Sequence, residues 1–224
     1  MSLNARAWWS VIGLAVGMGA LVFGPAGTIA YWRGWLYFAV VIGASAYTTL
    51  DLIRRDPALL ERRLRGGPTA EREPAQRVIM AIASVSFIGS LVVPALGWRF
   101  GWSVVPAWLS LTGDLLVATG FAGILRVYRE NTYTAATVQV AEGQSVISTG
   151  PYAVVRHPMY AFALLYLAGT PLALGSYVGF LPILVFVPVL VWRLVDEERL
   201  LARDLRGYDA YLQQVRYRLV PRVW

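Results

Sequence analysis

The chain has 224 residues, of which 57% are hydrophobic and 15% charged, and its formal net charge is +7. Soluble domains carry about a quarter charged residues, so this chain lacks the polar surface that a soluble protein needs, and we expect a membrane protein. The sequence has no cysteine and a single histidine, His157, which excludes thiol chemistry, disulfides and multi-histidine metal centres. No metal site is therefore predicted.

The apolar stretches predict the helices in chain order. A helix needs roughly 20 apolar residues to cross the hydrocarbon core of a bilayer. Stretches of about that length lie at residues 8–31, 35–53, 78–97 and 106–125. The first stretch lacks a clear cleavage site for a signal peptidase and is interpreted as a retained helix.

Two shorter apolar stretches, 159–174 and 177–194, are separated only by Gly175 and Ser176 and predict a tight helical hairpin that spans or dips into the bilayer. Residues 193–212 show the periodicity of an amphipathic helix. The expected fold is an all-α, polytopic membrane bundle of about five to six transmembrane helices. Residues 1–126 form the N-terminal spans and 127–224 the catalytic part of one integrated domain.

The arginines predict the orientation. Seven lie from Arg54 to Arg77 and six from Arg199 onward, whereas the opposite connections hold only Arg33 and Arg99. By the positive-inside rule, both termini and both large loops are cytoplasmic. The same distribution argues against nucleic acid as a partner, because arginines between apolar segments face lipid headgroups. The chain lacks eukaryotic sorting signals, so a bacterial inner membrane is expected. Interfacial tryptophans are predicted at helix ends, at positions 8, 9, 32, 35, 98 and 102.

The densest cluster of polar residues precedes the predicted hairpin. Gly150-Pro151 indicates a turn, and Pro158 suits the first position of a helix. Arg156 and His157 would therefore lie beside a helix N-terminus, whose free N–H groups can bind an anionic ligand. The alternative is that Arg156 is a lipid-facing anchor and His157 an ordinary surface residue.

A second cluster follows the last apolar stretch. Arg193 and Glu197 are four residues apart and share one helix face. Glu198 falls on the apolar stripe, where a carboxylate needs a partner or a ligand because unpaired burial is costly. Asp114 lies inside a predicted span, where it is either functional or held by a structural hydrogen bond.

The runs Gln144–Tyr152 and Arg156–Tyr160, the pair Glu197-Glu198 and the ending that contains Tyr208, Tyr211 and Arg218–Pro221 resemble the isoprenylcysteine carboxyl methyltransferase family. The resemblance covers roughly residues 130–224. It implies a small helical membrane fold with a cytoplasmic S-adenosylmethionine pocket that the C-terminal region caps. The implied cofactor-binding residues are Gln139, Gln144, Ser145, Val146, Ile147, Tyr152, His157, Pro158, Met159, Tyr160, Glu197 and Glu198.

The same resemblance implies that Arg193 meets the carboxylate of the methyl acceptor, with Arg156 as a second catalytic candidate. The position of Gln144 is a histidine in some relatives, which argues against an essential side chain there. The function expected is S-adenosylmethionine-dependent methylation of a lipophilic acceptor that enters from the bilayer. A carboxylate, amine, phenol or thiol acceptor and any oligomeric state remain open.

Two other functions are weighed. Sterol reductases share a similar C-terminal membrane half and use NADPH, but they typically show Asn at the position of Met159 and lack Pro158. A non-catalytic membrane protein that kept the fold would not need the intact cluster from Gln144 to Tyr160 together with Glu197.

Overall fold

The computed structural model describes residues 1–65, 74–134 and 143–224, and its regular elements there are helical, as predicted. In chain order they are α1 (Leu3–Ala26), α2 (Trp32–Arg55), α3 (Pro57–Leu64), α4 (Pro74–Phe100), α5 (Ala107–Glu130), a 3₁₀ turn (Gly150–Ala153), α6 (Pro158–Ala173), α7 (Phe180–Asp204) and α8 (Tyr208–Gln214).

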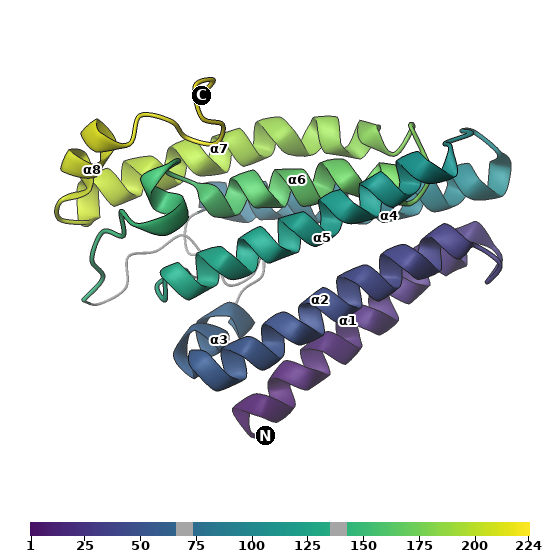
Figure 1. The fold of residues 1–224 in the computed structure, drawn as a ribbon, viewed down its shortest axis with the longest axis horizontal. Coiled ribbons are helices and arrows are strands. Elements are labelled where there is room, and N and C mark those ends of the chain that lie inside the picture. Colours follow the sequence, from purple (N-terminus) through teal and green to yellow (C-terminus); the bar gives the residue numbers. More distant parts are fainter. Residues whose placement is uncertain (66–73, 135–142) are drawn as a thin grey trace.

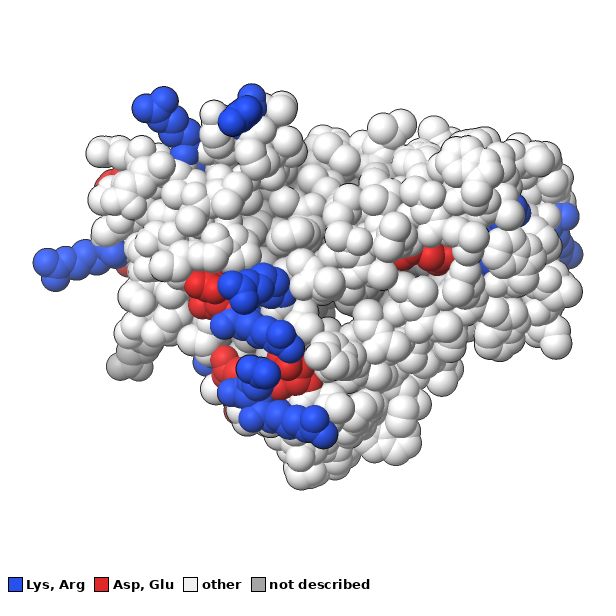
Figure 2. Space-filling model, viewed as in Figure 1, with Lys and Arg blue, Asp and Glu red and all other residues white. Residues whose placement is uncertain are grey.

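Four of the described helices, α1, α2, α4 and α5, are long and apolar enough to cross a membrane. Helix α6 has 16 residues and is about 24 Å long, short of the roughly 30 Å core. Helix α7 has 25 residues but ends in a charged segment. Figure 2 shows a face that is mostly uncharged along its length, with charged side chains gathered toward the end that carries α3 and α8. The protein is a polytopic membrane protein.

The helices of the bundle run alongside one another (Figure 1). Helices α4, α5, α6 and α7 form one group, and the pair α1–α2 packs against it through contacts of α1 with α4 and of α2 with α5. Helices α3 and α8, the segment before α6 and both termini lie toward the same end of the molecule. The arginine-rich connections therefore share one end of the bundle.

Helix α3 was not predicted, because it lies within the arginine-rich loop. Asp56 caps it by accepting a hydrogen bond from Leu59 N at 2.9 Å, and Pro57 begins it. Leu59 and Leu60 are buried against Leu52 at the end of α2. The tract Gly66-Gly67-Pro68 lies outside the described residues.

Glycines allow α5 and α6 to pack closely. A Cβ atom at Gly113 would lie 2.3 Å from the backbone nitrogen of Ala173, and one at Gly120 would lie 2.8 Å from the backbone oxygen of Phe162. Small residues at helix interfaces in membranes allow such backbone contact. This contact fixes α6, whose first turn carries part of the site.

The helix predicted over residues 193–212 has different bounds in the structure. Helix α7 runs unbroken from Phe180 to Asp204, so Arg193 lies within it. The change from apolar to charged residues at Arg193 does not mark the start of a new helix. It marks a change in the surroundings of α7 along its length. The chain then turns at Gly207, whose φ of 88° favours glycine, and α8 starts at Tyr208.

Candidate functional site

A cavity of about 620 Å³ lies between α4, α5, α6 and α7 at the end of the bundle that carries the arginine-rich connections. Its volume is in the range of small-molecule sites. One end is lined by polar and aromatic side chains of the segments before α6 and of α8, including Asn131, Gln144, Tyr152 and Tyr208. The other end lies between α4, α6 and α7 and is apolar except for Ser84. Its walls include Ala83, Phe87, Ile88, Ala163, Phe186 and Leu190.

The segment 144–149 has no regular secondary structure and enters the 3₁₀ turn through Gly150. Gly150 has a φ of 56°, and a Cβ atom there would lie 2.6 Å from the carboxyl carbon of Glu130 at the end of α5. The Thr149 hydroxyl donates to the same carboxylate. Residues 144–147 are therefore held along the cavity wall, where all four contribute to its lining.

Two hydroxyls and an amide order the aromatic wall of the polar end. Asn131 Nδ2 donates to Tyr152 OH at 3.0 Å, and Tyr211 OH donates to the backbone oxygen of Tyr152 at 2.8 Å. Burial raises the pKa of Tyr152 to about 12, so this hydroxyl keeps its proton. The hydroxyl of Tyr208 is also buried, lines the cavity and has no hydrogen-bond partner among the described residues.

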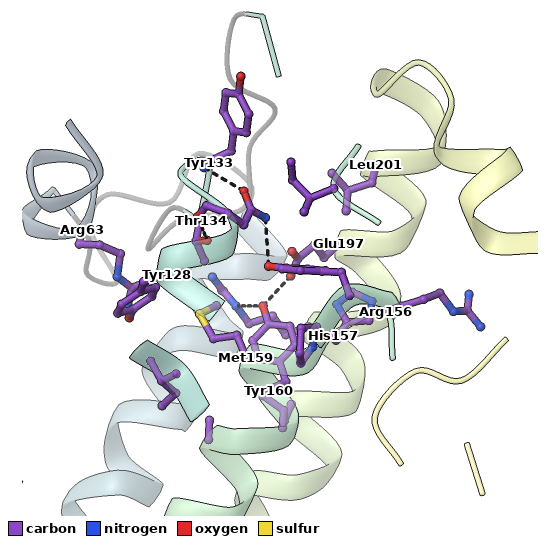
Figure 3. Close-up of a pocket in the computed structure, with 18 of the residues that line it drawn as sticks. Arg63, Tyr128, Tyr133, Thr134, Arg156, His157, Met159, Tyr160, Glu197 and Leu201 are labelled. Carbon is purple, nitrogen blue, oxygen red and sulfur yellow. Dashed lines mark hydrogen bonds between the residues drawn. The ribbon is translucent and has the colours of Figure 1, made fainter. Parts of the chain in front are cut away.

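Tyr160, Arg193 and Glu197 meet where the two ends of the cavity join. Arg193 Nε donates to Tyr160 OH at 3.2 Å, and Tyr160 OH donates to Glu197 Oε2. Figure 3 shows Tyr160, His157 and Glu197 together at the centre of the site. The ring of His157 stacks on that of Tyr160, with 5.7 Å between centroids. The two predicted clusters, which are more than 30 residues apart in the chain, thus form one site.

Glu198 lies outside the cavity lining, although it was predicted to bind the cofactor. It is 7% exposed and pairs with Arg156 Nη1 at 3.0 Å, with His157 Nε2 at 3.2 Å and with Arg218 Nε at 2.9 Å. Burial raises the pKa of this carboxyl, but the hydrogen bonds from His157 and Arg218 and the charge of Arg156 outweigh it and hold the pKa below its ordinary value.

The segment that follows α8 is fastened to the residues before α6. The backbone nitrogens of Arg156 and His157 donate to the backbone oxygens of Tyr217 and Arg218, both at 2.9 Å. Arg156 Nη2 also donates to Arg216 O at 2.8 Å. The guanidinium of Arg156 is thus engaged with the C-terminal segment and points away from the centre of the site (Figure 3).

Most of the predicted site residues gather around this one cavity. Gln139 lies outside the described residues, and Glu198 is the one described candidate that does not line the cavity. The candidates that line it are Gln144, Ser145, Val146, Ile147, Tyr152, Arg156, His157, Pro158, Met159, Tyr160, Arg193 and Glu197.

Sequence reasoning missed Asn131, Tyr128 and Tyr208 as lining residues and Gln76 as a partner of Arg193. Tyr208 was the easiest of these to predict, because it lies in the C-terminal motif that carried the resemblance. Gln76 lies 117 residues before Arg193 in the chain, and no local pattern marks it.

The family model described as phospholipid methyltransferase matches residues 108–206, somewhat less than half of the chain. The match begins in α5 and ends just before α8, so it includes the segment before α6 and the charged end of α7. No curated protein matches the chain. The predicted relationship to membrane methyltransferases is confirmed over this part of the chain.

Proposed function

We propose that the protein is an S-adenosylmethionine-dependent methyltransferase that methylates a lipophilic acceptor reached from the bilayer. The observation that carries the proposal is the form of the cavity, whose polar and apolar ends join at Tyr160, Arg193 and Glu197. A methyl donor with a charged head, a ribose and an adenine suits the polar end. An apolar acceptor chain suits the wall between α4 and α7.

The residues at the polar end fit such a donor. The Glu197 carboxylate can accept from hydroxyl or ammonium groups. The buried hydroxyl of Tyr208, which has no partner among the described residues, can hydrogen-bond to the donor. The faces of Tyr152 and Tyr160 can lie against a ring or a sulfonium cation. When bound, the donor supplies an electrophilic methyl group.

The chain's own residues would orient the acceptor and exclude water. Arg193 is suited to an anionic acceptor group, because its guanidinium lines the cavity at the start of the apolar end. A carboxylate acceptor needs no general base, so positioning can supply most of the rate. An amine or hydroxyl acceptor would lose a proton to His157 or Glu197.

Calorimetric titration of the purified protein in detergent tests the donor. S-Adenosylhomocysteine, the demethylated product, is expected to bind with a dissociation constant of about 1 μM, on the order of −8 kcal/mol. Binding of NADPH without any response to S-adenosylhomocysteine would favour the reductase instead.

Two variants test the division of roles within the site. Glu197→Ala is expected to weaken S-adenosylhomocysteine binding by about tenfold or more, because it removes the hydrogen-bonding carboxyl group from the polar end of the cavity. Arg193→Ala is expected to change this affinity less than threefold and to abolish turnover. Equal loss of donor affinity in both variants would show that the roles are assigned incorrectly.

We also propose that the arginine-rich end faces the cytoplasm, most simply of a bacterial inner membrane, because the methyl donor is made in the cytosol and is too polar to cross a bilayer. Seven arginines from Arg54 to Arg77 and six from Arg199 onward support this orientation.

A further inference from the structure

Gln76, in the first turn of α4, is 1% exposed. Its Oε1 accepts a hydrogen bond from Arg193 Nη1 at 2.8 Å, and its Nε2 donates to a carboxylate oxygen of Asp196. The side chain thus uses its acceptor toward a cation and its donor toward an anion. A neutral amide can do both, whereas a carboxylate can only accept and an apolar side chain can do neither.

The Gln76 contact fixes the guanidinium of Arg193 from one side, while Tyr160 holds its Nε from the other side. An arginine side chain loses about 2 kcal/mol of rotamer entropy when it is held in one geometry. Contacts that hold it before the acceptor arrives therefore leave less ordering to be done on binding.

Gln76 shares a face of α4 with the apolar end of the cavity. Met80, Ala83 and Phe87 follow it at helical spacing, and all three line the cavity. One face of α4 thus carries a partner of Arg193 and part of the wall for an acceptor chain. Helix α4 precedes residues 108–206, to which the methyltransferase family model is matched.

We propose that Gln76 is a positioning residue that determines the choice of acceptor. It holds the Arg193 guanidinium in the orientation that receives an anionic headgroup. The chain attached to this headgroup would lie in the apolar end of the cavity. The proposal rests on the proposed function, because it assigns the acceptor end of that same site. Because Gln76 lies in α4, this helix would contribute to the choice of acceptor.

The test compares two probes with the same chain and opposite charge, dodecanoate and dodecylamine, titrated calorimetrically into the detergent-solubilised protein saturated with S-adenosylhomocysteine. The wild-type protein is expected to bind dodecanoate at least tenfold more tightly. Gln76→Met and Gln76→Glu are each expected to weaken dodecanoate binding by about tenfold, because one removes a hydrogen bond to a charged group and the other places a carboxylate against Arg193 and Asp196.

The affinity for S-adenosylhomocysteine separates positioning from folding, because it should stay within twofold of wild type in both variants. Ser90→Ala is the matched control. Ser90 is also a buried polar residue of α4, but it bonds to its own helix at Phe87 O and does not line the cavity. It should leave both affinities unchanged.

A double-variant cycle tests the route through Arg193. The pair Gln76→Met and Arg193→Met should bind dodecanoate no more weakly than Arg193→Met alone. Additive losses, unchanged dodecanoate binding in both Gln76 variants, or a parallel loss of S-adenosylhomocysteine binding would each overturn the proposal. So would a wild-type preference for dodecylamine.

A wild-type protein that binds no S-adenosylhomocysteine would refute the proposed function. The same probes titrated without S-adenosylhomocysteine would then still decide the role of Gln76.

Discussion

Tyr208 lines the cavity, and its buried hydroxyl has no hydrogen-bond partner among the described residues. A buried hydroxyl that lacks a partner is costly, so a bound ligand is expected to satisfy it. We predict that Tyr208→Phe weakens S-adenosylhomocysteine binding by about fivefold, the usual worth of one hydrogen bond, and leaves thermal stability unchanged or raised.

Tyr211→Phe provides the comparison, measured by calorimetry and thermal unfolding. The Tyr211 hydroxyl already donates to Tyr152 O, so its loss should lower stability as well as affinity. If Tyr208→Phe binds the ligand as tightly as wild type, its hydroxyl does not contact the donor.

The Glu198 carboxylate links α7 to His157, Arg156 and Arg218. Its pKa is held below the ordinary value of 4.5. A depressed folded-state pKa stabilises the fold in full above that ordinary value, and the stabilisation is lost as the pH falls through the folded-state pKa. The wild-type melting temperature should therefore fall on acidification below about pH 4.5.

Glu198→Gln should lower the free energy of unfolding by about 3 kcal/mol at pH 7, because it leaves the partly buried guanidiniums of Arg156 and Arg218 without their counter-charge. The difference in melting temperature between the two proteins should shrink as the pH falls toward 3. A difference in melting temperature between wild type and Glu198→Gln that stays constant from pH 7 to pH 3 would contradict this role. Thermal unfolding in a detergent that tolerates acid provides the measurement.

At this scale the sequence predicts residues that stand in short motifs. His157, Tyr160, Arg193 and Glu197 could be named because each lies in a short motif that resembles the isoprenylcysteine carboxyl methyltransferase family. Gln76 could not be named, because its partner is 117 residues away and a glutamine near a helix end has many ordinary roles. Glu198 was correctly expected to need partners, but the sequence could not distinguish a ligand from the two arginines and the histidine that pair with it.

The contact between α5 and α6 depends on glycine. A Cβ atom at Gly113 would meet the backbone of α6 at 2.3 Å, so the two helices must separate to admit it. We predict that Gly113→Ala lowers the free energy of unfolding by about 1–3 kcal/mol and weakens S-adenosylhomocysteine binding, because α6 carries His157 and Tyr160 at its start.

Gly17→Ala on α1 is the matched control, since nothing lies within 4 Å of a Cβ atom there. It should be neutral or stabilise by about 0.5–1 kcal/mol, through helix propensity alone. Both variants can be compared by thermal unfolding in one detergent. Equal stability of Gly113→Ala and wild type would mean that α5 and α6 move apart without cost.

The helices themselves were largely predictable, because four long apolar stretches leave few alternatives. Their ends were less so. The start of a charged segment at Arg193 suggested a new helix, but charge does not break the hydrogen-bonded ladder of a helix, and α7 continues to Asp204. Helix α3 has a clear start signal at Asp56-Pro57, which its arginine-rich surroundings obscured.

The orientation of the whole molecule in the membrane can be tested by cysteine labelling, because the chain contains no cysteine. Ala58 on α3 and Gln213 on α8 are exposed at the arginine-rich end, and Val104 is 89% exposed at the opposite end. In intact cells, Val104→Cys should react with a membrane-impermeant thiol reagent, whereas Ala58→Cys and Gln213→Cys should not.

Both protected positions should react once the membrane is permeabilised, which shows that they are accessible. Labelling of Gln213→Cys in intact cells would reverse the orientation and exclude a donor that arrives from the cytosol.

The backbone bonds from Arg156 and His157 to Tyr217 and Arg218 have a consequence for biosynthesis. The ribosome makes Arg218 after every helix of the bundle, so the membrane-inserted nascent chain has its transmembrane helices before its donor site can close. Released chains truncated after Gln214 should insert normally yet fail to be retained on immobilised S-adenosylhomocysteine, while chains that include the segment after Gln214 are retained. Binding of the proposed methyl donor would then require the segment after α8, which is made once the helices before it are complete.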